Sequence, residues 1–222
     1  DGFRTDYIEA ARELELPNMR WPGGNYTLTY DWKDGIGPKE DRPIRRELAW
    51  NVLDRNHVGT DEWLQLADAM GVESSICINV TTASLSDNKD WIEYVNSPKG
   101  SYYADLRAKY GHPEPYGVKY WHIGNEVDGE PWQAVALTSK EYVTYAKDVT
   151  TMMRFVNREC KTCVQPVFIV MGSSWVFNDG EYADWAQWNQ DVIDGLITQE
   201  NVHYVAMHRY WGTGFSKKVK DD

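Results

Sequence analysis

Short apolar runs alternate with longer amphipathic segments along most of this chain. Strands are expected at 16–21, 75–80, 118–123, 167–171 and 202–207, where the runs have strand length. Helices are expected at 5–14, 60–71, 102–110, 138–156 and 182–197, where apolar residues recur at helical spacing. The pattern predicts an α/β fold in which strand and helix alternate five times.

Local capping signals define several helix ends. Thr5 and Thr60 are expected N-caps, because a threonine hydroxyl can accept a hydrogen bond from a free N–H of the first turn. Thr138, followed three residues later by Glu141, predicts a capping box. Gly71 is expected to end the second helix, since glycine readily adopts the left-handed conformation found there.

The strands are nearly continuous apolar runs, which is typical of a parallel sheet covered on both faces. A doubly wound sheet and a (β/α)8 TIM barrel both fit, although the dinucleotide-binding form lacks its glycine fingerprint here. Polar residues follow the C-terminal ends of all five strands: Arg20, Asn79, Asn125 with Glu126, Ser173 with Ser174, and His208 with Tyr210. These ends meet on the active-site face of a barrel, so we expect the barrel.

Composition excludes some classes of partner. A net charge of −11 argues against nucleic acid and anionic membranes, which both need a basic footprint, although it also fits a merely solubilising surface. No segment reaches the roughly 18 apolar residues of a transmembrane helix. The 11 Trp and 14 Tyr can stack on sugar rings, but core packing explains most of them.

The cysteines predict neither a disulfide framework nor a metal site. Their number is odd, and Cys160 and Cys163 have redox or zinc spacing without a second pair. His203 and His208 are not spaced as metal partners. Three cysteines without an evident pairing favour a reducing compartment.

Glu126 directly follows an apolar strand, where a carboxylate is costly unless it has a use. An ion pair at the barrel rim is the simpler interpretation. The neighbouring Asn, Arg, His and Tyr side chains suit a neutral, hydroxyl-rich ligand. Glycoside hydrolysis is a reaction that needs only carboxylates on such a background.

Several motifs carry a family resemblance. They are Arg20-Trp21-Pro22-Gly23-Gly24-Asn25, Trp32-Lys33-Asp34-Gly35-Ile36-Gly37-Pro38, Arg42-Pro43, Ala49-Trp50, Gly124-Asn125-Glu126 and Trp132-Gln133. In this order the chain resembles the family 51 glycoside hydrolases, the α-L-arabinofuranosidases of a large clan of retaining (β/α)8 enzymes. The resemblance runs from about Asp1 to Tyr210.

The resemblance implies a role for each matching residue. Glu126 corresponds to the general acid/base, and Asn125 to the residue that binds the sugar 2-hydroxyl. Arg20 and Asn25 correspond to residues of the arabinose pocket, although Arg20 could simply brace carboxylates. His208 and Tyr210 correspond to a pair near the nucleophile. Trp50 corresponds to an aromatic wall of the site, although it could instead pack in the core. Trp132 corresponds to a residue on the aglycone side.

The nucleophile is expected outside these residues. Asp61-Glu62-Trp63 resembles the family's nucleophile stretch, but Glu62 falls in the first turn of a predicted helix. In the family the nucleophile lies on the seventh strand. Residues 1–222 are therefore expected to form one partial barrel domain holding strands two to six, catalytically incomplete and with open sheet edges that destabilise it.

The sequence departs from the family pattern at Val80-Thr81-Thr82, at 128–132 and after Gln133, which affects the aglycone side most. The expected activity is exo-acting removal of arabinofuranosyl side chains from arabinan, arabinoxylan or their oligosaccharides. An endo-glucanase or xylanase of the same clan and a non-catalytic sugar-binding barrel stay open as alternatives. No cofactor is implied. Relatives often form hexamers, and bacterial ones are mostly cytoplasmic whereas fungal ones are secreted.

Overall fold

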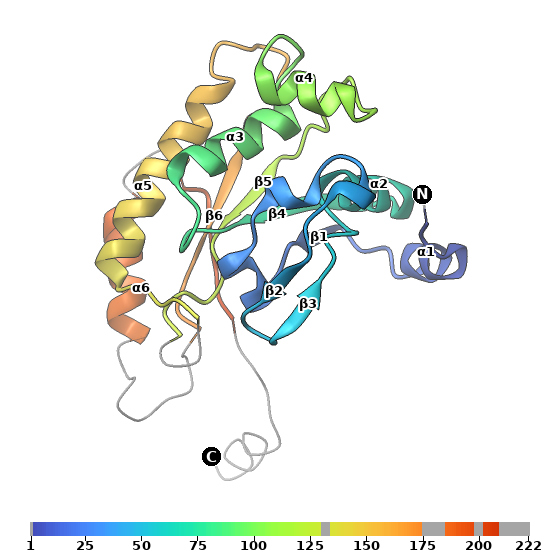
Figure 1. Cartoon of the computed structure of the whole chain (residues 1–222). Helices are drawn as coiled ribbons and strands as arrows, with labels where there is room; N and C mark the ends of the chain where they lie inside the picture. Colours follow the sequence, from blue (N-terminus) through green and yellow to red (C-terminus); the bar gives the residue numbers. More distant parts are fainter. Residues whose placement is uncertain (1, 130–133, 175–184, 198–201, 209–222) are drawn as a thin grey trace.

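The fold is seen in a computed structural model that describes residues 2–129, 134–174, 185–197 and 202–208 (Figure 1). Its centre is a five-stranded parallel sheet. The strands are β1 (Asn18–Trp21), β4 (Glu73–Ile78), β5 (Tyr120–Ile123), β6 (Val167–Met171) and β7 (Tyr204–Ala206). All five predicted strands are present, with ends shifted by at most two residues.

The strand order separates the two folds that the sequence left open. Neighbours in the sheet follow chain order, β1-β4-β5-β6-β7, without a reversal. A doubly wound sheet reverses its order at a switch point, whereas a barrel adds each strand on the same side of the last. The five strands are therefore consecutive strands of a partial (β/α)8 barrel.

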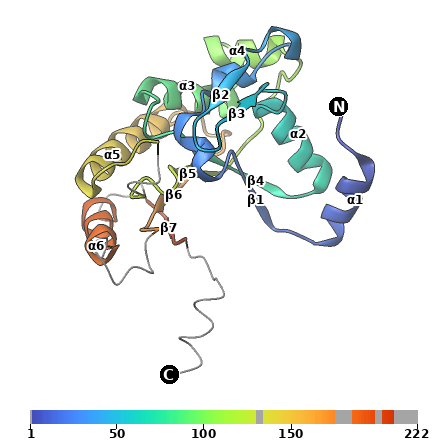
Figure 2. The same ribbon diagram turned by 60° about the horizontal axis from the view of Figure 1, so that its bottom comes forward.

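In the described part of the chain, six α-helices accompany the sheet: α1 (Thr5–Glu13), α2 (Thr60–Met70), α3 (Leu85–Asn96), α4 (Tyr102–Lys109), α5 (Ser139–Val156) and α6 (Trp185–Leu196). Figure 2 shows α1 and α2 at one end of the sheet and α5 and α6 at the other, as in Figure 1. Among the described residues, no helix combines the length and apolar character needed to cross a bilayer.

Two of the predicted caps are wrong. Thr5 and Thr60 are the first residues inside their helices, and the N-cap positions are Arg4 and Gly59. The capping box at Thr138 is confirmed, since its hydroxyl accepts the Glu141 N–H and the Glu141 carboxylate accepts the Thr138 N–H. Gly71 ends α2 with φ +74° as predicted.

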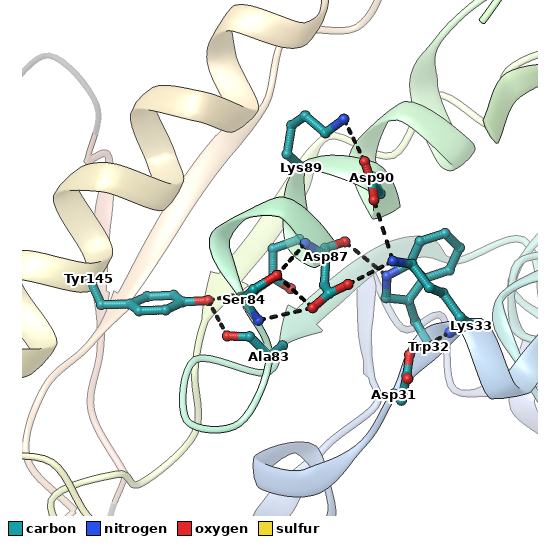
Figure 3. A network of polar contacts seen from close by, with 10 residues as sticks. Asp31, Trp32, Lys33, Ala83, Ser84, Asp87, Lys89, Asp90 and Tyr145 are labelled. Carbon is teal, nitrogen blue, oxygen red and sulfur yellow. Dashed lines mark hydrogen bonds and ion pairs between the residues drawn. The ribbon is translucent and has the colours of Figure 1, made fainter. Parts of the chain in front are cut away.

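Helix α3 was not predicted, although its start carries a signal. The Ser84 hydroxyl accepts the Asp87 N–H, and the Asp87 carboxylate accepts the Ser84 N–H, which is a capping box with aspartate. Lys33 reaches across to the same helix, with Nζ 2.6 Å from Asp87 Oδ1 and 3.3 Å from Asp90 Oδ2 (Figure 3). This network joins α3 to the loop that follows β1.

The loop between β1 and α2 is long and structured, which the sequence analysis did not foresee. It contains three 3-10 turns, η1 (Gly24–Thr29), η2 (Trp32–Gly35) and η3 (Lys39–Asp41). The antiparallel hairpin of β2 (Arg45–Glu47) and β3 (Val52–Asp54) follows. Because it leaves the C-terminal end of β1, this loop belongs to the face on which a barrel builds its active site.

The two faces of the sheet differ in chemistry. One face packs on the helices through a row of aligned, largely buried residues, Trp21, Ile76, Trp121 and Phe168. The other carries Arg20 on β1 and the aligned Cys77, His122, Ile169 and Tyr204, of which Tyr204 is 55% exposed. This second face is the interior of the barrel, which further strands would enclose.

The cysteine pairing differs from the expectation. Cys160 and Cys163 form a disulfide in the turn after α5, so the expectation of three unpaired cysteines is wrong. Their separation of three residues allowed a bridge, and the turn brings their Cα atoms within 5.4 Å. Cys77 is a free and buried thiol.

Candidate active site

The site begins at a sharp turn after β5. Gly124 has φ +86°, and a Cβ at this position would lie 2.7 Å from Cγ2 of Val80, two residues after β4. Both the backbone conformation and the close approach of Val80 therefore require glycine. Glu126 also has a positive φ, of 48°, which is uncommon for a residue with a side chain and marks a constrained position.

Glu126 faces a histidine from another strand. His208 Nδ1 lies 2.8 Å from Glu126 Oε1, and the two side chains are 23% and 10% exposed. His208 follows β7, so two strand ends separated by β6 meet at this contact. A carboxyl group that contacts a histidine and is nearly removed from solvent is suited to giving and taking a proton.

Asn125 lies beside Glu126 and is 1% exposed. Its Nδ2 donates to Asn25 Oδ1 at 3.3 Å, which connects the β5 turn to the loop after β1. Its Oδ1 is buried, and no group in the described part of the chain hydrogen-bonds to it. A buried acceptor without a donor costs free energy, so this oxygen is available to a ligand hydroxyl.

Arg20 lies within β1 rather than after it, which corrects the sequence expectation. Its Nη1 is 4.0 Å from Cys77 Sγ, on the interior face of the sheet. Burial lowers the pKa of His122 to about 4, and the charges of Arg20 and His208 add to the effect. His122 is therefore neutral at pH 7. His122 was not predicted as a site residue, although its position between the apolar Trp121 and Ile123 places it on the opposite face of the strand from both.

Trp50 does not pack in the core. It lies in the turn of the β2–β3 hairpin with 69% of its surface exposed, which rules out the core-packing interpretation. The Glu47 carboxylate holds this turn by accepting the N–H groups of Ala49 and Trp50 at 2.8 and 2.6 Å. Tyr210 and Trp132 fall outside the described residues.

Other polar strand ends serve the scaffold. The Asn79 side chain bonds to two loops: Oδ1 accepts the N–H groups of Thr81 and Thr82 in its own loop, and Nδ2 donates to Tyr30 O in the loop after β1. Ser173 and Ser174 both donate to the carboxylate of Asp128. Asp128, two residues after Glu126, was given no role of its own from the sequence.

The carboxylates at the start of α2 are also structural. Glu62 accepts two hydrogen bonds of 2.9 Å from Arg42 and one from the Gly59 N–H, as expected of a residue in a first helical turn. Asp61 accepts the hydroxyls of Tyr94 and Tyr116, both at 2.6 Å. Burial raises the pKa of Asp61. The prediction that Glu62 belongs to a helix and not to a strand end is confirmed.

The assembled site is a cluster of hydrogen-bonding side chains around one carboxylate. Glu126, His208, Asn125 and Asn25 are brought together, and Arg20 lies on the interior face, where its charge and that of His208 both act on His122. Among the described residues, no group of three or more His, Cys, Asp or Glu side chains is placed to hold a metal ion.

Comparisons with known proteins agree with this geometry. Residues 10–151 match the family model described as alpha-L-arabinofuranosidase 1 domain. An intracellular exo-alpha-(1->5)-L-arabinofuranosidase 1 of Bacillus subtilis is 38% identical over 96% of this chain and 40% of its own length. A probable alpha-L-arabinofuranosidase C of Aspergillus fumigatus is 45% identical over 72% of this chain and 32% of its own.

Solved structures extend the match to three dimensions. The alpha-L-arabinofuranosidase of Thermotoga maritima, solved as an arabinose complex, superposes with a TM-score of 0.84 at 39% identity. The comparison covers 96% of this chain and 40% of that one. The chain thus spans about two-fifths of these relatives or less. It belongs to the α-L-arabinofuranosidases of glycoside hydrolase family 51 and is part of their (β/α)8 barrel.

Proposed function

We propose that this chain is the acid/base half of a retaining, exo-acting α-L-arabinofuranosidase. The observation that carries the proposal is the Glu126–His208 contact of 2.8 Å beside the unpaired Asn125 oxygen. Glu126 would protonate the departing glycosidic oxygen and then remove a proton from the attacking water. His208 would hold the carboxyl group in place for both steps.

The proposed sugar-binding roles follow from the hydrogen-bonding groups that each side chain can offer a ligand. Asn125 Oδ1 would accept the 2-hydroxyl of an arabinofuranosyl residue, a contact that strengthens in the transition state. Asn25 would fix the Asn125 amide, and Arg20 would add donors deeper in the barrel. Trp50 and Tyr210 stay predictions: the first lies on an exposed hairpin of the active-site face, and the second lies outside the described residues.

A retaining mechanism needs a second carboxylate about 5–5.5 Å from the first. We propose that it lies on a seventh strand beyond the residues given, since Glu62 is engaged by Arg42 and the chain covers 40% of its Bacillus subtilis relative. Residues 1–222 by themselves would then be inactive. Measurable arabinofuranosidase turnover by this segment alone would contradict that part of the proposal.

Arabinan, arabinoxylan and their oligosaccharides are the proposed substrates, because the matching relatives are named arabinofuranosidases. A cytoplasmic location is proposed from the relatives named intracellular, and the Cys160–Cys163 disulfide is the observation that speaks for secretion instead. Self-association of the whole enzyme is proposed as well. Nucleic acid and membranes are not proposed as partners, because the net charge of −11 argues against both.

The test is hydrolysis of aryl α-L-arabinofuranosides by the full-length enzyme, with Glu126→Ala and Glu62→Ala compared. Glu126→Ala should lose turnover of poor leaving groups, and azide should restore turnover of an activated substrate as an arabinosyl azide of retained configuration. Glu62→Ala is the matched control, because it removes a family-like carboxylate that holds the scaffold; azide should not rescue it. Activity on glucan or xylan without any on arabinosides would overturn the proposed substrate.

A further inference from the structure

The turn that carries Glu126 is fastened to the next strand end by Asp128. The Asp128 carboxylate accepts hydrogen bonds from Ser173 Oγ at 2.6 Å, Ser174 Oγ at 2.7 Å and the Ser174 N–H at 2.9 Å. These three contacts use both carboxylate oxygens. We call Asp128, Ser173 and Ser174 the Asp128 clamp.

The far side of the clamp is itself fixed. The Ser173 N–H donates to Asn189 Oδ1 of α6 at 2.8 Å. The Gly172 N–H donates to the Ala206 carbonyl of β7 at 2.8 Å, one strand further along the sheet. The loop after β6 is therefore attached to a helix and to β7, and Asp128 connects the Glu126 turn to this support.

The near side of the clamp needs such a support. Glu126 has the positive φ of 48° that a residue with a Cβ adopts only when its surroundings impose it. Within the turn, the Gly129 N–H donates to the Glu126 carbonyl at 3.1 Å, and the Val127 N–H approaches Met171 Sδ at 3.3 Å. Thioether sulfur is a weak acceptor, so the charged Asp128 bonds are the stronger of these two links between the turn and β6 with its following loop. The Tyr142 hydroxyl joins the strands one step earlier, donating to Ile123 O and accepting the Met171 N–H.

We propose that Asp128 is a positioning residue for the acid/base function of Glu126. The inference rests on the proposed function and adds a residue to it. Asp128 acts through the backbone of the turn: its carboxylate binds the serines and sets where the Glu126 carboxyl group points. The proton donor is then held at the leaving oxygen, where a displacement of about 1 Å costs on the order of 100-fold in rate.

Leaving-group dependence separates positioning from mere stability. In the full-length enzyme, Asp128→Asn should lower kcat/KM about 10- to 100-fold for arabinosides with poor leaving groups, which need a well-placed proton. For a dinitrophenyl arabinoside, which needs none, the loss should stay within about threefold. Equal losses on both substrates would overturn the inference, because a merely structural defect lowers both.

The partner side of the clamp supplies the second variant. Ser173→Ala with Ser174→Ala removes two of the three hydrogen bonds without touching Asp128, and it should reproduce the same substrate dependence. Combining it with Asp128→Asn should add little, since both changes break one interaction. Fully additive losses would show that Asp128 acts elsewhere.

Hydrogen exchange tests the clamp without relying on activity. Asp128→Asn should speed amide exchange in residues 124–129 at least several-fold, while the core helix α5 stays unchanged. Unchanged exchange in 124–129 would overturn the inference even in an active enzyme. If the wild-type enzyme cleaves no arabinoside but exchange responds as expected, the proposed function fails and the clamp stands.

Discussion

His208 Nδ1 lies 2.8 Å from Glu126 Oε1, although 82 positions separate the two residues in sequence. The contact spans β6, because Glu126 follows β5 and His208 follows β7. A parallel sheet that curves brings alternate strand ends toward a common centre, as a barrel requires. This contact joins residues from two strand ends of the partial barrel into a candidate active site.

The contact predicts the behaviour of two His208 variants. In the full-length enzyme, His208→Ala should reduce kcat/KM on an aryl arabinoside about 100-fold, since one group orienting the acid/base is lost. His208→Asn keeps a short side chain that can donate, so it should lose less. Steady-state kinetics checks both, and equal activity of His208→Ala and wild type would contradict the role of the contact.

Replacing Gly124 should destabilise the fold more than replacing Gly71, which also has a positive φ but open space around it. Gly124→Ala meets both the positive φ and a clash at 2.7 Å with Val80 Cγ2, so unfolding should become easier by about 2–4 kcal/mol. Gly71→Ala meets a φ of +74° with open space around it and should cost only about 1 kcal/mol. Urea unfolding measures both, and similar losses would show that Val80 yields.

Glu62 predicts a pH-dependent stability. Burial alone would raise its pKa, but the hydrogen bonds from Arg42 and the Gly59 N–H outweigh it and hold the pKa below the ordinary 4.5. A lowered folded-state pKa contributes stability above 4.5 that is lost as pH falls below it. Glu62→Gln should therefore cost about 3 kcal/mol at pH 7 and progressively less in acid. A cost that stays constant in unfolding experiments from pH 7 to 3 would contradict this account.

The disulfide predicts a thiol count. Alkylation of the denatured protein without reductant should label Cys77 alone, and prior reduction should make all three cysteines reactive. In the native protein Cys77 should resist labelling, because it is buried. Mass spectrometry counts the alkylated cysteines. If protein prepared in air carries three labels without reductant, the Cys160–Cys163 bridge is absent.

The sequence predicted the repeating part of the structure well. Apolar runs gave all five strands, and the Thr138–Glu141 box gave the start of α5, because each signal depends on neighbours in sequence. It missed α3, whose cap uses Asp87 in place of Glu, and it gave Thr60 a capping role that Gly59 holds. The loop after β1 escaped prediction since its 3-10 turns and hairpin depend on contacts across the fold.

The sequence by itself determined the strand–helix alternation, the family motifs and the strand end at which Glu126 lies, because these depend on composition and spacing. Only the tertiary structure decided which polar strand ends face one another. In the fold, Ser173 and Ser174 donate to Asp128, and Asn79 bonds to its own loop and to the loop after β1. The Asn125 oxygen next to Glu126 has no hydrogen-bond partner among the described residues. The physical reason is that buried polar side chains must find hydrogen-bond partners, and several candidates are far apart in sequence. Which of them pair depends on distances that only the folded barrel sets.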